Sequence, residues 1–232
     1  MSKPAESDWD AVLSAAARLQ GHFPEAVLVG GTASAIYAAH RVSHDADHVL
    51  PNLKEEFDTI LSKLESVAGW KLARVNKPVL ILGSLDGVDT GIRQLIRDEA
   101  LETKEVVIRN QKIVVPTEEE ILRIKSALTL KRNAVRDYVD FAALSYSLGE
   151  KTTAQAFKRF DNLYPQKNGQ SAVQQLCLQL SDPRPFDLRD TNLAVYKNLT
   201  DKWKKWESVK EQCIQSAGII FNSLEMEQAE IN

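Results

Sequence analysis

Two aspartates separated by one residue, Asp45 and Asp47, are the side chains in this sequence with the clearest chemical potential. They lie in the run 42–50, which we predict to be a β-strand. Strand side chains alternate between the two faces, so both carboxylates should point to the same side. Two carboxylates on one face repel each other unless a cation lies between them. Hard oxygen ligands at this density suit Mg²⁺ or Mn²⁺, and such a metal would neutralise nucleotide phosphates, so we predict a metal-binding pair.

A glycine pair, Gly30 and Gly31, precedes these aspartates and follows the short apolar run 25–29. We predict a buried strand over 25–29 and a helix over 32–39. A helix N-terminus leaves backbone N–H groups unpaired and carries a positive partial charge, so a glycine turn there can hold phosphate oxygens closely. The same element also describes a tight turn in which only glycine tolerates the backbone angles.

Two residues further along could complete such a site. Asp89 lies in the predicted strand 88–92 and could come alongside the first two aspartates, where a third carboxylate would bind metal and help to deprotonate a nucleophile. Lys125 lies on a helix that begins with a T-x-x-E capping box at Thr117, and its positive charge could bind phosphate. The alternative for this charged helical region is a solvated face with i,i+4 pairs such as Arg136 with Asp140.

The remaining pattern separates a mixed N-terminal half from a helical C-terminal half. Helical spacing predicts an N-terminal helix that ends at Gly21, and strand and hairpin signals follow the helix predicted over 53–68. We expect the hairpin of 106–108 with 112–115 at the edge of the sheet. The predicted elements are strands over 70–75, 78–82, 88–92, 106–108 and 112–115, and helices over 136–144, 153–164, 170–180, 191–199 and 201–224. The fold class is therefore α+β (α/β-like), with an α/β domain over 1–116 and a helical domain over 117–232.

Composition places the chain among ordinary globular proteins. It has 232 residues, 44% hydrophobic and 26% charged, with a formal net charge of -3 that provides no global basic surface for nucleic acid. Cys177 and Cys213 lack metal-ligand spacing and are predicted to be buried free thiols. No segment reaches the roughly 18 apolar residues that a membrane span needs, so we expect a cytoplasmic protein without a membrane partner.

Four segments in order carry a resemblance to a known family. They are Gly-Gly-Thr-Ala at 30–33, His-Arg-Val-Ser-His-Asp-Ala-Asp at 40–47, Ile-Lys-Ser-Ala at 124–127 and Arg-Asp-Tyr-Val-Asp at 136–140. With them the chain resembles the nucleotidyltransferase family of the AbiEii toxins, to which the MenT toxins are related, inside the DNA polymerase β-like superfamily. The resemblance covers residues 27–144 and implies a mixed sheet flanked by helices.

The resemblance implies an enzyme that moves a nucleoside monophosphate from an NTP to an acceptor such as tRNA, as the toxin of a toxin–antitoxin pair with a cognate antitoxin protein. Mg²⁺ or Mn²⁺ would be bound by Asp45 and Asp47, with Asp89 as the candidate third ligand. The NTP would be held by Gly30, Gly31, Thr32, Arg41, Ser43 and Lys125. The remaining candidates for catalysis are Asp137 and Asp140, either of which would match the acid that family members place near the site.

Two alternatives stay open. The first is a binding or neutralising protein that keeps the nucleotidyltransferase fold without the chemistry, which carboxylates too far apart to share a metal would favour. The second is a metal-dependent phosphohydrolase of HD type, because His40, His44 and Asp45 form an H-x-x-x-H-D string that would align metal ligands on a helix. Imidazole ligands would then favour a softer metal than Mg²⁺.

Overall fold

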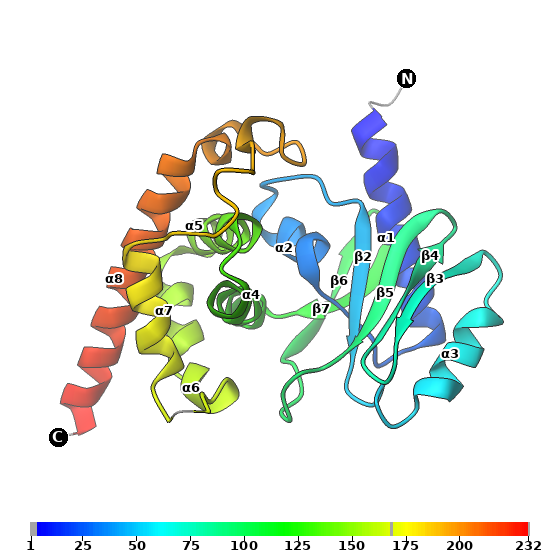
Figure 1. Ribbon diagram of the computed structural model, residues 1–232, viewed down its shortest axis with the longest axis horizontal. Coiled ribbons are helices and arrows are strands. Elements are labelled where there is room, and N and C mark those ends of the chain that lie inside the picture. The colour runs from blue at the N-terminus through cyan, green and yellow to red at the C-terminus, as the bar shows by residue number, and fades with distance from the viewer. Residues whose placement is uncertain (1–3, 168, 232) are drawn as a thin grey trace. The chain divides into compact units, whose positions relative to one another are not determined.

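The computed structural model describes residues 4–167 and 169–231, which divide into two compact units (Figure 1). The sheet unit consists of Met1–Ala33 and Val42–Thr117. The helical unit consists of Ser34–Arg41 and Glu118–Asn232. A short internal segment, residues 34–41, therefore groups with the C-terminal half of the chain.

The sheet unit has a mixed sheet in the order β1-β2-β5-β4-β3. β2 and β5 are parallel, whereas the other neighbouring pairs are antiparallel. The strands of this sheet are β1 (Val27–Leu28), β2 (Asp45–Leu50), β3 (Trp70–Asn76), β4 (Leu80–Leu85) and β5 (Val88–Gln94). The prediction of a mixed sheet flanked by helices is confirmed.

One face of this sheet is covered by α1 (Pro4–His22) and α3 (Phe57–Glu65). The core between them is apolar: Leu19 of α1 and Ile60 of α3 are buried with Ile92 of β5. These residues follow the period of their elements, 3.6 for the helices and two for the strand, so burial selects a single face of each. The opposite face of the sheet remains available for polar side chains, and the aspartates lie there.

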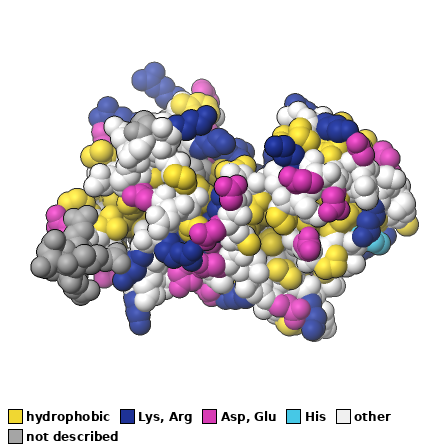
Figure 2. Space-filling model, turned by 90° about the horizontal axis from the view of Figure 1, so that it is seen from below, with side chains coloured by type: hydrophobic (Ala, Val, Ile, Leu, Met, Phe, Trp, Pro, Cys, Tyr) yellow, Lys and Arg dark blue, Asp and Glu magenta, His cyan; other side chains and the backbone are white. Residues whose placement is uncertain are grey.

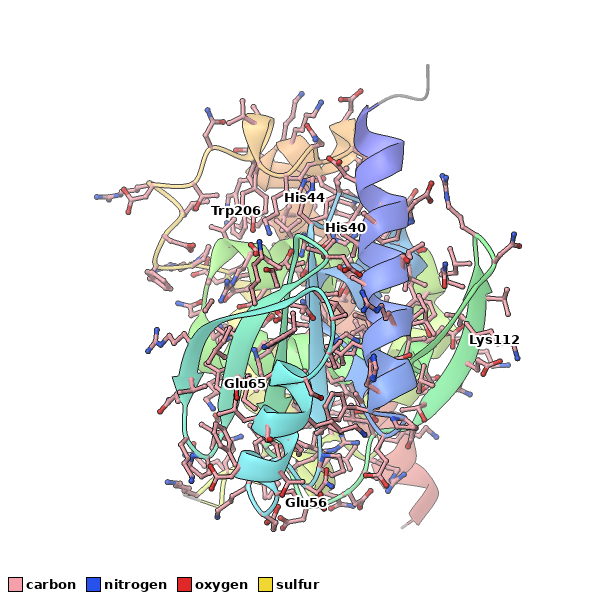
Figure 3. All side chains as sticks on the ribbon, turned by 90° about the vertical axis from the view of Figure 1, so that its right-hand side faces the viewer. His40, His44, Glu56, Glu65, Lys112 and Trp206 are labelled. Carbon is pink, nitrogen blue, oxygen red and sulfur yellow. The ribbon has the colours of Figure 1, made fainter. Side chains whose placement is uncertain are left out.

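The predicted hairpin forms, but not at the edge of the main sheet. β6 (Thr103–Ile108) and β7 (Gln111–Pro116) pair with each other as a separate sheet of two strands within the described residues. Figure 3 labels Lys112 on β7, and there the hairpin lies on one side of α1 with β3 and β4 on the other. Gln20 of α1 fixes this position, because its side chain donates to the carbonyl of Val114 and accepts from its N–H, both at 2.8 Å. Contacts with α1 therefore decide the place of the hairpin.

The helical unit contains the two longest helices of the described chain, which are α5 and α8. In the described chain its elements are the end of α2 (Gly30–Ala38), α4 (Glu118–Arg132), α5 (Val135–Phe157), α6 (Phe160–Leu163), α7 (Ala172–Ser181), the 3-10 turns η1 (Leu193–Val195) and η2 (Asp201–Lys204), and α8 (Trp206–Ile231). Gly149 interrupts α5 with φ of 79° and ψ of 174°, between the helices predicted over 136–144 and 153–164. Both cysteines are buried and free, as predicted.

Two helical predictions are wrong. The helix expected over 191–199 is reduced to the short turn η1, because Tyr196 and its neighbours continue in extended and left-handed conformations up to Asn198. The helix expected over 153–164 is divided, since the chain leaves α5 at Lys158 and forms α6 separately. Helical spacing of apolar residues did not reveal these backbone interruptions.

Charge and hydropathy give two further observations. Figure 2 shows acidic, basic and hydrophobic side chains interspersed on the face in view, in keeping with the small net charge of -3. Within residues 4–167 and 169–231, no helix is long and apolar enough to cross a membrane.

Candidate active site

The glycine turn forms where the sequence placed it. α2 begins at Gly30, whose φ of +72° is the left-handed conformation that glycine adopts without strain. The N–H of Val29 donates to the carbonyl of Asp47 at 2.8 Å, which ties the residue before the turn to β2. The turn and the acidic strand are therefore neighbours by backbone hydrogen bonding within the sheet unit.

Asp45 and Asp47 share one face of β2, as their spacing predicts. Both are half-buried, whereas the alternate residues Ala46, His48 and Leu50 are buried on the core side. The strand is inserted between β1 and β5, so its two faces are fixed by pairing on both edges. The aspartates consequently project from the open face of the sheet.

Asp89 joins the same face. Parallel pairing places Asp45 opposite Asp89, and residues opposite each other in adjacent strands direct their side chains to one side. Asp89 is exposed, and register brings it next to the acidic pair along β5. Among the described residues, however, no group of three or more His, Cys, Asp or Glu side chains is arranged to hold a metal ion.

Asp47 lies close to two glycines. A Cβ atom added to Gly30 would lie 3.6 Å from Asp47 Oδ2, and one added to Gly91 would lie 3.6 Å from Asp47 Oδ1. At Gly91 such an atom would also come within 2.5 Å of Leu82 Cδ2 and 3.0 Å of the Ile81 carbonyl oxygen. The close approach of β4 therefore leaves little room for a side chain at position 91, and in the sequence the only signal of this was a glycine inside a predicted strand.

Arg93 is a residue of this face that the sequence interpretation missed. Its Nη2 lies 3.9 Å from Asp47 Oδ1. The signal was available, because residues 89, 91 and 93 alternate onto the same face as Asp89. Arg93 brings a positive charge to a face otherwise defined by carboxylates.

Two hydroxyl groups position the acidic strand. Ser43 Oγ donates to Asp45 Oδ1 at 3.2 Å, and Thr32 Oγ1 donates to the backbone carbonyl of Asp45. Both side chains are buried. Thr32 therefore connects the start of α2 to β2, and Ser43 connects the loop before β2 to that strand. Their direct contact with a nucleotide stays a prediction.

His48 points away from the acidic pair. It is fully buried on the core face, and in the described structure neither ring nitrogen has a hydrogen-bond partner. Burial lowers the pKa of His48 to about 4, so the ring is neutral at pH 7. Alternate strand residues face opposite sides of a sheet. The His48 imidazole would therefore not be a ligand of a metal that Asp45 and Asp47 bind on the open face.

The HD-type alternative requires His40, His44 and Asp45 on one helix, and this prediction is wrong. Residues 39–44 lie between α2 and β2 and adopt no helix. His44, labelled in Figure 3, is exposed, and its Nδ1 lies 4.0 Å from Asp8 Oδ2. His40 belongs to the helical unit, where its side chain has a different partner.

That partner is Asp140, the centre of a buried polar cluster in the helical unit. His40 Nε2 and Arg41 Nε lie 2.7 Å and 2.8 Å from Asp140 Oδ1, and Lys125 Nζ donates to Asp140 Oδ2 at 2.7 Å. Arg41 Nη2 adds a second contact to Oδ2 at 3.2 Å. Asp140 therefore pairs with Lys125 of α4 and with His40 and Arg41 of the loop after α2, and the i,i+4 pair expected with Arg136 is not its arrangement.

The electrostatics of this cluster favour ionised Asp140. Burial by itself raises the pKa of Asp140, but the positive charges of Lys125 and Arg41 and the hydrogen bond with His40 outweigh burial and hold the pKa well below its usual value of 3.8. The side chains of all four residues are at most 6% exposed. The charges of Lys125 and Arg41 are thus matched by a carboxylate of their own unit.

Asp137, the other acid of that segment, is buried in a different way. Burial raises its pKa, against the opposing effects of Lys125, Arg132 and Arg136. Arg132 Nη1 and Arg136 Nε each lie 3.8 Å from one of its carboxylate oxygens, beyond hydrogen-bond distance. Within the described structure, its Oδ2 accepts no hydrogen bond. Asp137 and Asp140 therefore occupy distinct environments although they lie one helical turn apart.

The predicted site residues consequently fall into two groups. The open face of the sheet unit holds Asp45, Asp47 and Asp89 beside Gly30 and Gly31, with Thr32 and Ser43 beneath them. The helical unit holds Arg41, Lys125, Asp137 and Asp140. For the first group, the donor chemistry fits a divalent metal, because Mg²⁺ is commonly held by one or two carboxylates together with substrate phosphates and water.

The fold defines a class of protein. The chain has a nucleotidyltransferase-like fold, which it shares with solved structures of that description. It also matches JHP933 from Helicobacter pylori with a TM-score of 0.58 and 16% identity, over 100% of this chain and 98% of that one. A putative nucleotidyltransferase from H. pylori matches with a TM-score of 0.58 and 15% identity, over 97% and 98% of the two chains.

A toxin shares this fold. The nucleotidyltransferase toxin MenT4 from Mycobacterium tuberculosis H37Rv matches with a TM-score of 0.54 and 13% identity, over 94% of this chain and 86% of MenT4. The resemblance predicted for the fold is therefore confirmed at the level of structure. No protein-family model matches the chain.

Sequence comparison finds a different kind of relative. The heme uptake protein MmpL11 of M. tuberculosis H37Rv is 34% identical over 124 residues, and the mycolic acid-containing lipids exporter MmpL11 of Mycolicibacterium smegmatis is 28% identical over 132 residues. These matches cover 52% and 56% of this chain but only 12% and 13% of the relatives. The transport roles in these names belong to those proteins.

Proposed function

We propose that the chain is a nucleotidyltransferase that moves a nucleoside monophosphate from an NTP to an acceptor hydroxyl. The observation that supports it most directly is the juxtaposition in the sheet unit of Asp45 and Asp47 on one face, with the Gly30 turn beside Asp47. In our proposal Asp45 and Asp47 hold Mg²⁺ or Mn²⁺, and such an ion supplies charge neutralisation to the triphosphate. The fold shared with nucleotidyltransferases supports the reaction class.

The reaction is a substitution at the α-phosphorus of the NTP. The acceptor oxygen forms a new bond to that phosphorus, the bond from the phosphorus to the oxygen bridging to the β-phosphate breaks, and pyrophosphate leaves with the electron pair. Asp89, exposed on the same face as Asp45, is the proposed acceptor of the hydroxyl proton. The N–H groups at the start of α2 are the proposed contacts for the phosphates.

The biological setting follows the same proposal. The fold shared with MenT4 supports a toxin of a toxin–antitoxin pair, AbiEii-like, with an antitoxin protein as partner and tRNA as the first acceptor to test. We also propose a cytoplasmic site of action, where NTP and tRNA are available. Division of the chain into a nucleotidyltransferase domain over 1–116 and a helical domain over 117–232 is part of this proposal.

One experiment tests the reaction. The purified chain is incubated with each α-³²P-labelled NTP, Mg²⁺ or Mn²⁺ and total tRNA, beside Asp45→Asn, Asp47→Asn and the control Asp58→Asn. Asp58 is a carboxylate of the same unit that pairs with Lys77 on the exposed side of α3. We expect wild type and the control to label RNA, and both site variants to lose at least about 100-fold, because removing the ligands of a catalytic metal removes its charge stabilisation. Equal labelling by Asp47→Asn would contradict the proposed site.

A second candidate function is a nucleotidyltransferase-fold binding protein without catalysis. One observation favours it: in the described residues no three carboxylate, imidazole or thiol groups are arranged to hold a metal ion. A Mn²⁺ titration monitored by thermal unfolding separates the two candidates. A rise in Tm for wild type that is absent in Asp47→Asn supports the enzyme, whereas no rise in either supports the binding protein.

A further inference from the structure

The mixed sheet has two edges of different kinds. Among the described residues its order ends at β1 on one side and at β3, next to β4, on the other (Figure 1). β1 has two residues, whereas β3 has seven, and all of these except Trp70 are exposed. A long edge strand presents unpaired backbone N–H and C=O groups to a further strand. The edge of the sheet at β3, the β3 edge, can therefore accept an extended segment.

Two basic side chains of β3 lie on the open face of the sheet. Register places Lys71 opposite Ser84 and Arg74 opposite Leu82, and Ser84 in turn lies opposite Asp89. Residues opposite each other on adjacent strands share a face, so both cations project from the face that carries Asp89. Their odd separation along the chain would place them on opposite faces of a regular strand, but the bulge before Arg74 restores a shared face.

The charge of these cations is not neutralised by their own unit. Neither Lys71 nor Arg74 forms an ion pair within the described residues, whereas Lys77, just after the strand, pairs with Asp58. β3 itself contains no acidic residue. The open face of the β3 edge is therefore positively charged and complementary to carboxylates.

Apolar side chains of β3 lie on the opposite face. Leu72 and Val75 are 43% and 42% exposed, and they lie opposite Gly83 and Ile81 of β4, which are buried. Ile81 belongs to the core that α1 and α3 cover. A strand added to β3 would extend this core, because its apolar side chains would cover Leu72 and Val75.

This alternation determines which partner fits. Side chains opposite each other on adjacent strands interact, so opposite charges stabilise a pair of strands and like charges destabilise it. A segment beside β3 would place carboxylates next to Lys71 and Arg74 on one face and apolar residues next to Leu72 and Val75 on the other. A second copy of β3 does not fit, because it would bring another lysine and arginine to an edge that is already basic.

We propose that the β3 edge binds an extended segment of a partner protein in which acidic and apolar residues alternate, paired with β3 as a further strand of the sheet. In this mode of recognition, main-chain hydrogen bonds supply affinity and alternate side chains supply specificity. The proposal does not rest on the transfer reaction, because β3 contributes none of the residues assigned to that reaction.

The test uses the fluorescein-labelled peptide Glu-Val-Glu-Val-Thr-Val-Glu, titrated with the full chain and followed by anisotropy. A first comparison peptide, Glu-Glu-Glu-Thr-Val-Val-Val, keeps the composition without the alternation. A second has lysine in place of each glutamate. A third has the original side chains with every backbone nitrogen methylated, which removes the donors that a strand needs.

The site variant is Lys71→Glu with Arg74→Glu. Its control, Lys54→Glu with Lys112→Glu, makes the same change in net charge at exposed lysines of the same unit that lie outside β3. Circular dichroism and thermal unfolding verify that both variants are folded.

We expect the site variant to bind the alternating acidic peptide at least about tenfold more weakly than wild type, because two attractive cross-strand pairs become repulsive. It should bind the lysine peptide at least about tenfold more tightly than wild type does. The control should stay within about twofold of wild type for the acidic peptide. Wild type should bind the rearranged and the methylated peptides at least about fivefold more weakly than the alternating one.

Several results would overturn the proposal. Equal affinity of wild type for the alternating, rearranged and methylated peptides would show charge attraction without strand pairing. No binding of the alternating peptide would leave Lys71 and Arg74 as charges that only protect an edge from aggregation. A wild-type dimer in sedimentation velocity that the site variant dissociates would assign the edge to a second copy. Tighter binding of a single-stranded RNA oligonucleotide, lost in the site variant, would assign the two cations to nucleic acid.

This proposal and the transfer reaction fail separately. Peptide binding requires neither metal nor NTP, so Asp47→Asn should bind the alternating peptide like wild type even when it transfers no label. The site variant should in turn label RNA as wild type does. Peptide binding that Asp47→Asn loses as completely as the site variant would contradict the assignment to β3.

Discussion

The two units place their carboxylates in opposite surroundings. In the sheet unit, Asp45, Asp47 and Asp89 lie on an open face, half-buried or exposed, beside a glycine turn. In the helical unit, Asp140 is buried and contacts three basic side chains at hydrogen-bond distance. An open carboxylate can accept a cation or proton from a ligand. A buried carboxylate with this many partners has a structural role. The same residue type therefore serves different purposes in the two units.

The largest effect on stability should come from Asp140→Ala. Its removal leaves the positive charges of Lys125 and Arg41 buried without their carboxylate, and breaking a buried pair in this way costs about 3–5 kcal/mol. Urea unfolding followed by circular dichroism measures the loss. The control is Asp201→Ala, a 96% exposed partner of Lys204, for which we expect an almost unchanged urea midpoint because solvent screens such a pair. Similar urea midpoints for Asp140→Ala and Asp201→Ala would contradict a structural role for Asp140.

Gly91→Ala tests the packing on the acidic face of the sheet. The added Cβ would meet Leu82 Cδ2 at 2.5 Å and the Ile81 carbonyl oxygen at 3.0 Å, and overpacking of this kind costs about 1–3 kcal/mol. Gly21→Ala is the matched control, because its added Cβ has no atom within 4 Å and it lies in α1. We expect the control to be neutral or slightly stabilising in the same urea experiment. A neutral Gly91→Ala would show that the Leu82 side chain and the neighbouring backbone of β4 make room for the added methyl group.

The sheet unit should also be the more sensitive to mild acid. Burial lowers the pKa of His48 to about 4 from its usual 6.5, so between these values the unfolded chain binds the proton more strongly than the folded one. The stability contributed by neutral His48 is therefore complete above pH 6.5 and is lost as pH falls toward 4. Between pH 7 and pH 5 the loss should be about 2 kcal/mol.

Urea unfolding at pH 7 and pH 5 measures this loss, with hydrogen exchange of peptides from residues 42–95 locating it. His48→Leu should remove most of the difference between the two pH values. The pKa of Asp140 is lowered in the folded chain. Its contribution to the free energy of unfolding is therefore present above the usual pKa of 3.8 and is lost only at lower pH. Equal pH dependence in wild type and His48→Leu would place the acid sensitivity elsewhere.

The smallest effect on stability is expected at the open face itself. Asp47→Asn should change the free energy of unfolding by less than about 0.5 kcal/mol, because the side chain is partly exposed and the amide keeps its size and hydrogen-bonding capacity. The same substitution should remove most of the transfer activity. A destabilisation above about 2 kcal/mol would indicate that Asp47, like Asp140, has a structural role. The carboxylates of the two units would then no longer differ in purpose.

Short-range features of the site were predictable from sequence. The period of a strand places Asp45 and Asp47 on one face, and the same rule would have placed Arg93 beside Asp89 on the neighbouring strand. The position of Gly30 at the start of a helix followed from an apolar run that ends in glycine. These are local properties, because each depends on a few successive backbone conformations.

Partners distant in sequence were not predictable in this way. His40 and Asp140 are 100 residues apart, and no spacing rule connects them. The edge position expected for the β6–β7 hairpin was wrong because contacts of Gln20 with Val114, 94 residues away, fix it against α1. The helical unit also has a pocket in which Arg132 and Arg136 meet Phe186 and Tyr196, and the segment that contains these two rings has no regular period.

The sequence by itself determined the element types, the shared face of the acidic pair and the glycine turn, since hydrophobic period and backbone preference act over a few residues. Only the tertiary structure decided the parallel register that brings Asp89 opposite Asp45, the burial that neutralises His48 and the pairing that commits Lys125 to Asp140. The physical reason is that register, desolvation and ion pairing depend on which distant segments pack together, and a local pattern contains no information about that choice.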